Sequence, residues 1–340
     1  MIVEIKDDIF TGNDFKGLNY LIQILTYKQR YELFVDLSII SNTNYYKRLD
    51  IDDKNEMESS FNKLITEGLD PNPKYFISTN SNIDNCFSIE EAVIFFNQPI
   101  SIILENSLND QYFLMAIIKY FDETGEVQRQ LDNGWIQFEN AGGCTNVENF
   151  INGKLQSFNN LSCRYNKKKY IYLRCFVLLD SDKEYPNEPL KNEHQNLFNF
   201  LIDNNILNHF LEKRCMENYM PDEVFNKISG TPEQKNWLAV YLLLSIEQKS
   251  FLNISRGFSK KDGNGVSIKD RQSLKQEIKS FYSNISQVNY EILDKGFTLA
   301  HFKNEFPKNF SDSLIEKTTL QNCCNSNELQ NIIDKIASIL

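Results

Sequence analysis

The sequence predicts an α/β protein in which helices flank a parallel sheet, with an N-terminal α/β region before the sheet and a helical region after it. Cys175 to Leu179 is an uninterrupted apolar run that ends in Asp180, as expected for a strand buried on both faces of a parallel sheet. Ile100 to Leu104 is a second such run, followed by a polar turn and a helical pattern. A short strand is expected at Phe210 and Leu211. Residues 226–340 carry apolar residues mainly at helical spacing, with helices expected at 237–246 and 269–282 and a loop at 260–265.

Residues 1–97 form the N-terminal α/β region, for which we expect a role in recognition or assembly because no residue pattern in it indicates chemistry. Leu18, Leu21, Ile22 and Leu25 recur at helical spacing, which predicts a helix capped by Asn13 or Asp14. The expected elements of this region are helices at 13–28, 57–65 and 88–96 and strands at 33–40 and 74–78.

Residues 98–225 contain successive strand–helix units. The strand at 100–104 ends in Glu105, and a helix with apolar residues from Tyr112 to Ile117 follows. The next strand, around Ile136 and Phe138, leads to Gly142-Gly143 and to a capping box at 145–148. At this turn the backbone could approach a ligand closely, although a tight turn without a ligand is the alternative.

Two carboxylates, Asp180 and Asp182, follow the central strand. Ligands bind at the carboxyl edge of open α/β sheets, and residues i and i+2 of an extended strand point the same way. The pair could therefore converge on one cation. The alternative is an ordinary acidic loop after a core strand.

Composition limits the function classes. The chain has 340 residues, of which 41% are apolar and 24% charged, as in ordinary globular proteins. Its longest apolar run, Trp237 to Ile246, is too short to cross a bilayer, and the first residues lack the order of a signal peptide. Seven cysteines without a Cys-x-x-Cys spacing fit a reducing cytoplasm, and none of the three histidines lies at metal-ligand spacing. We therefore expect a cytoplasmic protein without a membrane partner.

The net charge of −10 argues against a chain that coats nucleic acid by bulk electrostatics. A local basic strip could still hold a phosphate backbone. The candidate strip consists of Arg164, Lys167, Lys168 and Lys169, immediately before the central strand. A solvated loop is the alternative explanation.

Three motifs occur in order: a strand ending in Glu105, a strand ending in Asp180-x-Asp182, and Lys213-Arg-x-x-Glu217-Asn-Tyr. Together they resemble the TOPRIM domain of nucleases related to the OLD (overcoming lysogenisation defect) family, over about residues 98–225. The family pattern Glu-Gly-x-x-Asp is changed here to Glu105-Asn-Ser-Leu-Asn-Asp110. Asp110 is thus either an active-site residue or only a helix cap.

The resemblance implies a metal-dependent nuclease that hydrolyses phosphodiester bonds in DNA or RNA, including tRNA. Asp180 and Asp182 would bind Mg2+ or Mn2+, Glu105 would bind metal or act as general acid/base, and Glu217 would support a second ion. Lys213 or Arg214 would stabilise the transition state, with Arg214 also contacting nucleic acid. Surface ion pairs with neighbouring glutamates are the alternative for these two cations.

The resemblance also implies a partner, because families of this kind often act in anti-phage defence with an ABC- or SMC-like ATPase. This chain has no Gly-x-x-x-x-Gly-Lys-Ser/Thr loop, so the ATPase would be a separate polypeptide. A catalytically inactive scaffold subunit with the same fold is the alternative, and a homo-oligomer is possible. The stripe Leu329, Ile332, Ile333 and Ile336 either docks on a partner or closes the protein's own core.

Overall fold

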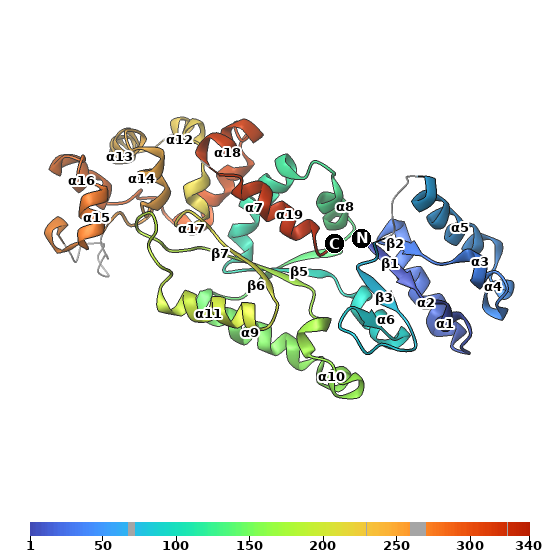
Figure 1. Cartoon of the computed structure of the whole chain (residues 1–340). Helices are drawn as coiled ribbons and strands as arrows, with labels where there is room; N and C mark the ends of the chain where they lie inside the picture. Colours follow the sequence, from blue (N-terminus) through green and yellow to red (C-terminus); the bar gives the residue numbers. More distant parts are fainter. Residues whose placement is uncertain (67–71, 229, 259–269, 325) are drawn as a thin grey trace.

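The computed structural model describes residues 1–66, 72–228, 230–258, 270–324 and 326–340, and it confirms the α/β class. Two four-stranded parallel sheets are flanked by helices (Figure 1). Within the described ranges, no helix has the length and apolar character needed to cross a membrane.

The N-terminal sheet has the strand order β2-β1-β3-β4. Its strands are β1 (Ile2–Ile5), β2 (Glu32–Phe34), β3 (Tyr75–Ile77) and β4 (Cys86–Phe87). The surrounding helices are α1 (Asp7–Phe10), α2 (Phe15–Thr26), α3 (Leu37–Ile40), α4 (Asn44–Arg48), α5 (Ile51–Thr66) and α6 (Ile89–Asn97). The expected caps at Asp14 and Ser88 are both confirmed.

The strand predicted at residues 33–40 is wrong in its second half. Strand β2 ends at Phe34, and the Asp36 side chain accepts a hydrogen bond from the Ser38 N–H at 3.0 Å. This bond satisfies a free N–H at the first turn of α3, so the apolar residues that follow form a helical turn instead of a strand.

The central sheet has the order β6-β5-β7-β8, and all its strand pairs are parallel. Its strands are β5 (Ile100–Leu104), β6 (Ile136–Asn140), β7 (Cys175–Leu179) and β8 (Leu207–Phe210). Every residue of β5 and β7 is buried, as the apolar runs predicted. Because the strands are parallel, their carboxyl ends meet at one edge of the sheet.

Helices cover both faces of this sheet (Figure 1). They are α7 (Ser107–Phe121), α8 (Glu126–Asp132), α9 (Cys144–Gln156) and α11 (Asn192–Asp203), whereas α10 (Asn159–Tyr165) packs in the core of the N-terminal region. Along β7, Phe176 and Leu178 pack into the core shared with α7, whereas Val177 packs into the core shared with α9 and α11. This alternation follows from the two-residue period of a strand.

The capping box predicted at residues 145–148 does not form. Helix α9 already begins at Cys144, because Gly143 makes the turn into the helix and its N–H donates to the Glu105 carbonyl at 3.1 Å. Gly142 and Gly143 have φ values of 77° and 108°, which side chains of L-residues rarely allow.

The C-terminal region is helical, as predicted. Its helices are α12 (Asp222–Lys227), α13 (Pro232–Leu242), α14 (Ile246–Phe251), α15 (Gln276–Phe281), α16 (Gln287–Asp294), α17 (Phe302–Glu305), α18 (Lys317–Cys323) and α19 (Glu328–Ala337). The apolar run from Trp237 to Ile246 is not one helix, because Leu243 is exposed in a turn and Ser245 caps α14. The helix expected at 269–282 is shortened to α15, and the loop expected at 260–265 lies outside the described residues.

The apolar stripe of α19 closes the protein's own core, which was one of the two alternatives. Leu329, Ile332, Ile333 and Ile336 are all buried in one cluster with residues of β5 and α7. A partner therefore cannot use this stripe as its docking surface in the folded chain.

Candidate functional site

The carboxyl edge of the central sheet opens into a cavity of about 380 Å³. Elements from the sheet and from the C-terminal helical region border it, including the turn after α14 and the start of α17. Five carboxylates line the cavity: Glu105 after β5, Asp110 in the first turn of α7, Asp180 and Asp182 after β7, and Glu217 in the 3-10 turn after β8.

Glu105 lies between two neighbouring elements. The backbone of Asp180 and of Cys144 lies close enough to the Glu105 carboxylate to lower its pKa. Burial raises the pKa of Glu105 to about 7, and the negative charge of Asp182 adds to the shift. Glu105 and Asp180 thus lie at the ends of adjacent parallel strands, as the sequence predicted.

The Asp180 side chain is hydrogen-bonded to the chain segment that follows β8. One of its oxygens accepts a hydrogen bond from the Met216 N–H at 3.1 Å. Asp180, Cys215 and Glu217 each bring one potential ligand atom into a group whose members lie within 4.8 Å of one another. Burial raises the pKa of Asp180 well above its ordinary value, and the charges of Glu217 and Glu105 raise it further.

Asp110 has both roles that the sequence left open. Its carboxylate accepts a hydrogen bond from the Asn106 N–H at 2.9 Å, which helps to cap α7. The same side chain lines the cavity, where burial raises its pKa to about 7.

The geometry expected for Asp182 is wrong. The chain leaves the extended conformation after β7, and Asp182 has φ +54° because its N–H is turned to donate to the Arg214 carbonyl at 2.9 Å. The carboxylate is 46% exposed and forms an ion pair with Lys191 at 3.4 Å. Among the described residues, Glu105, Asp180 and Asp182 do not form one close group of ligand atoms, although all three line the cavity.

Of the two cations in the Lys213-Arg214 motif, only Arg214 lines the cavity. Lys213 is buried, and its Nζ donates to the Asn218 carbonyl at 2.8 Å and lies 4.7 Å from the centre of the Tyr219 ring. Of the two alternatives, Lys213 thus lies away from the cavity, because its ammonium group is used inside the fold. A cation that the sequence did not indicate, Lys303 on α17, lines the cavity instead.

The basic strip predicted to hold nucleic acid lies at the opposite end of β7 from Asp180. The 3-10 turn Lys169–Tyr172 precedes the strand, which spans roughly 16 Å. Lys167 is buried and bonded to Glu91 at 2.8 Å, and Arg164 forms an ion pair with Glu90. Arg164, Lys168 and Lys169 are exposed, but the charge of Arg164 is paired and Lys167 is buried, so the strip as predicted is not a continuous basic surface.

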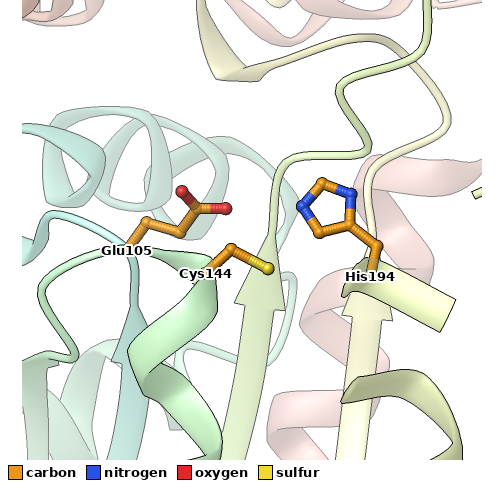
Figure 2. A group of neighbouring side chains, drawn as sticks. All are labelled: Glu105, Cys144 and His194. Carbon is orange, nitrogen blue, oxygen red and sulfur yellow. The ribbon is translucent and has the colours of Figure 1, made fainter. Parts of the chain in front are cut away.

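A second group of potential ligands contains Glu105. Glu105, Cys144 and His194 each bring one ligand atom within 4.8 Å of the others, and their side chains point toward one another (Figure 2). Cys144 and His194 could not be recognised from the sequence, because they are 50 residues apart and do not form a short metal-binding motif. Only the parallel topology brings α9 and α11 to the same edge.

Comparison of the chain with protein-family models, with curated proteins and with solved structures finds no match.

Proposed function

We propose that the protein is a metal-dependent nuclease that hydrolyses phosphodiester bonds in DNA or RNA. The observation that carries this proposal is the convergence of five carboxylates on one cavity at the carboxyl edge of a parallel sheet. The order of the motifs around Glu105, Asp180 and Glu217 supports a TOPRIM-type nuclease related to the OLD family.

The donor set fits a hard divalent cation. Magnesium and manganese prefer carboxylate oxygens, and the cavity offers these from Asp180, Glu217, Glu105 and Asp110. Without a cation these groups repel one another, which agrees with the raised pKa values of Glu105 and Asp110. When bound, the metal would offset negative charge on the phosphoryl oxygens and orient the attacking water.

The chain's own residues have separable roles in this proposal. Asp180 and Glu217 bring ligand atoms within 4.8 Å of one another and would hold the first ion, while Glu105 would support a second. A carboxyl group with a pKa of about 7, such as that of Glu105, can take up or release a proton near neutral pH. Arg214 would bind the phosphate of the substrate.

Two further features of the cavity suit an anionic substrate. Lys303 is exposed at the cavity, so its ammonium group can move toward a phosphate. Gly142 and Gly143 line the same cavity without side chains, which lets a phosphate approach the start of α9.

The biological setting that we propose follows from the same resemblance. The substrate would be DNA or RNA, including tRNA, and the protein would act in anti-phage defence with a separate ATPase. Control by such a partner would keep a preformed nuclease site from damaging the host. Assembly of several copies would be a second means of control.

The direct test is incubation of the purified protein with labelled plasmid, single-stranded DNA and total tRNA, with Mg2+ or Mn2+, with and without an ATPase encoded beside it. We expect cleavage of at least one substrate and its loss in Asp180→Asn. The matched control is Asp203→Asn, because Asp203 is exposed at the last residue of α11, away from the cavity. Metal and nucleic-acid binding without cleavage of any substrate would favour the scaffold alternative.

A further inference from the structure

We propose that Glu105, Cys144 and His194 form a binding site for a borderline divalent cation of the zinc class, next to the carboxylate group of Asp180 and Glu217. The three side chains come from the end of β5, the first turn of α9 and the first turn of α11 (Figure 2). They supply one oxygen, one sulfur and one nitrogen atom.

The spacing of the three ligand atoms is close to that of a tetrahedral site. Zinc bonds of about 2.0–2.3 Å place neighbouring ligands roughly 3.3–3.8 Å apart. The observed atoms all lie within 4.8 Å of one another. Side-chain rotations that bring them about 1 Å closer would close the group around one ion.

His194 gives an independent indication that this group takes a ligand. The residue is only 5% exposed, and one ring nitrogen faces Cys144 and Glu105 (Figure 2). The other ring nitrogen, Nδ1, also lacks a regular hydrogen bond to any described residue. Among the residues that the structure describes, Nδ1 is buried without a hydrogen-bond partner of normal geometry, although the Ser181 backbone is close enough to act on the ring's pKa.

A buried imidazole without such a partner loses hydrogen bonds that it had in water. Burial lowers the pKa of His194, which favours the neutral ring that binds metals. Coordination of the nitrogen that faces the group would recover one lost interaction and hold the ring in place.

The donor types decide which metal the site takes. Magnesium avoids sulfur and nitrogen ligands, whereas zinc and cobalt bind thiolate and imidazole readily. The site is also strongly negative. Burial and the charges of Glu105, Asp182 and Glu193 raise the pKa of Cys144 to about 12. A bound cation would lower the pKa of this thiol, which would then lose its proton to solvent.

Asp182 or a water molecule would supply the fourth ligand. Glu105 and Asp182 both line the cavity, and the charge of Asp182 acts on Glu105, Cys144 and His194. Glu105 also lines the cavity with Asp180 and Glu217, so a zinc-class ion bound to it would withdraw this carboxylate from a second ion of the nuclease site. This consequence rests on the proposed nuclease function and predicts inhibition by zinc, whereas the metal site itself does not depend on that function.

The test uses Co2+ as a spectroscopic probe with the metal-depleted full-length protein. We expect a near-ultraviolet thiolate-to-cobalt band that is absent in Cys144→Ser. Changing a residue that only supports a ligand typically weakens metal binding about 10–100-fold, so His194→Gln, which removes a ligand, should lower Co2+ affinity at least that much. The matched control is Cys163→Ser, because Cys163 is an exposed cysteine on α10 outside the group.

Several outcomes would overturn the proposal: no thiolate band in the wild type, a band that persists in Cys144→Ser, or a band lost only in Cys215→Ser. Zn2+ should also raise the melting temperature of the wild type and of Cys163→Ser but not of His194→Gln. This second measurement keeps the proposal testable should Cys144→Ser fold poorly. A thiolate band in a protein that cleaves no nucleic acid would support the metal site and count against the nuclease.

Discussion

Protonation of single carboxyl groups links the cavity to the stability of the fold. Glu105 and Asp110 have ordinary pKa values of 4.5 and 3.8, and the folded state raises both to about 7. Between these values the folded protein binds more protons than the unfolded chain. The free energy of unfolding of the metal-free protein therefore falls as the pH rises from about 4 to about 7.

Asp110→Asn should remove part of this pH dependence. The amide keeps an oxygen that can accept the Asn106 N–H but carries no charge, so the metal-free protein should gain about 1–3 kcal/mol at pH 7.5 and almost nothing at pH 4. Chemical unfolding in EDTA across this pH range measures the effect. Asp203→Asn is the control, and a loss of stability in Asp110→Asn at pH 7.5 would contradict the explanation that burial and neighbouring charges disfavour the ionised Asp110.

At the residue scale, the sequence predicted the positions of residues that directly follow a buried strand. Glu105 and Asp180 follow buried parallel strands, so their meeting at one edge could be inferred from the apolar runs. The directions of Asp182 and Lys213 could not, because they depend on hydrogen bonds between the turn after β7 and the turn after β8. The Ser181 hydroxyl and the Asp182 N–H both bind carbonyls of that second turn.

Helix α9 is the element whose start shapes the cavity most directly. Gly143 precedes it with φ 108° and ψ 156°, a region that is essentially restricted to glycine. This conformation lets Cys144 begin the helix with its backbone close to the Glu105 carboxylate. The glycine pair thus positions both a metal-ligand candidate and a backbone surface for phosphate.

Gly143→Ala should lower the free energy of unfolding by about 1–3 kcal/mol, because the added Cβ forces a strained backbone. No heavy atom would lie within 4 Å of that Cβ, so the loss would come from the backbone and not from a steric clash. Gly153→Ala, in the middle of the same helix and also without close neighbours, should instead stabilise by about 0.5–1 kcal/mol. Equal effects of the two substitutions in urea unfolding would refute this explanation.

Element types were easier to predict from the sequence than element ends. The strands around 100–104, 136–138, 175–179 and 210 all form, because short apolar runs between polar turns have few other stable arrangements. The errors at residues 33–40 and 237–246 have one cause. Asp36 and Ser245 satisfy backbone N–H groups locally, and a single cap of this kind starts a new helix inside an apolar run.

At the scale of the whole molecule, the two sheets are joined by a segment that returns to the N-terminal region. Phe158, Leu161 and Tyr172, which precede β7 in the chain, pack in the same core as α6. Within that core the Glu91 carboxylate accepts hydrogen bonds from Lys167 and Tyr172 at 2.8 Å and 2.7 Å. Burial raises the pKa of Glu91, but these partners hold it below its ordinary value.

Contacts of this kind, between residues far apart in the sequence, could not be predicted from the sequence. The basic run at 164–169 looked like a binding surface because charge alone carries no information on burial. The grouping of Glu105 with Cys144 and His194 was equally hidden, since it depends on which strands become neighbours. The burial of Lys167 and the grouping of the three ligands can be inferred only from the three-dimensional arrangement of the strands.

The buried ion pair provides a final prediction, which separates a structural role of Lys167 from nucleic-acid binding. Lys167→Met keeps most of the apolar stem but leaves Glu91 charged and unpaired, so it should destabilise the protein by about 3–5 kcal/mol. Lys168→Met, at an exposed neighbouring position, should change stability by no more than about 0.5 kcal/mol.

Adding Glu91→Gln to Lys167→Met should recover much of the loss, because the uncompensated buried charge is removed. Thermal and urea unfolding of the four proteins measure these differences. If Lys167→Met left stability unchanged and weakened nucleic-acid binding as much as Lys168→Met did, the residue would belong to a binding surface. We expect the reverse, since the Lys167 ammonium group is already bonded to Glu91 and to the Cys86 carbonyl inside the fold.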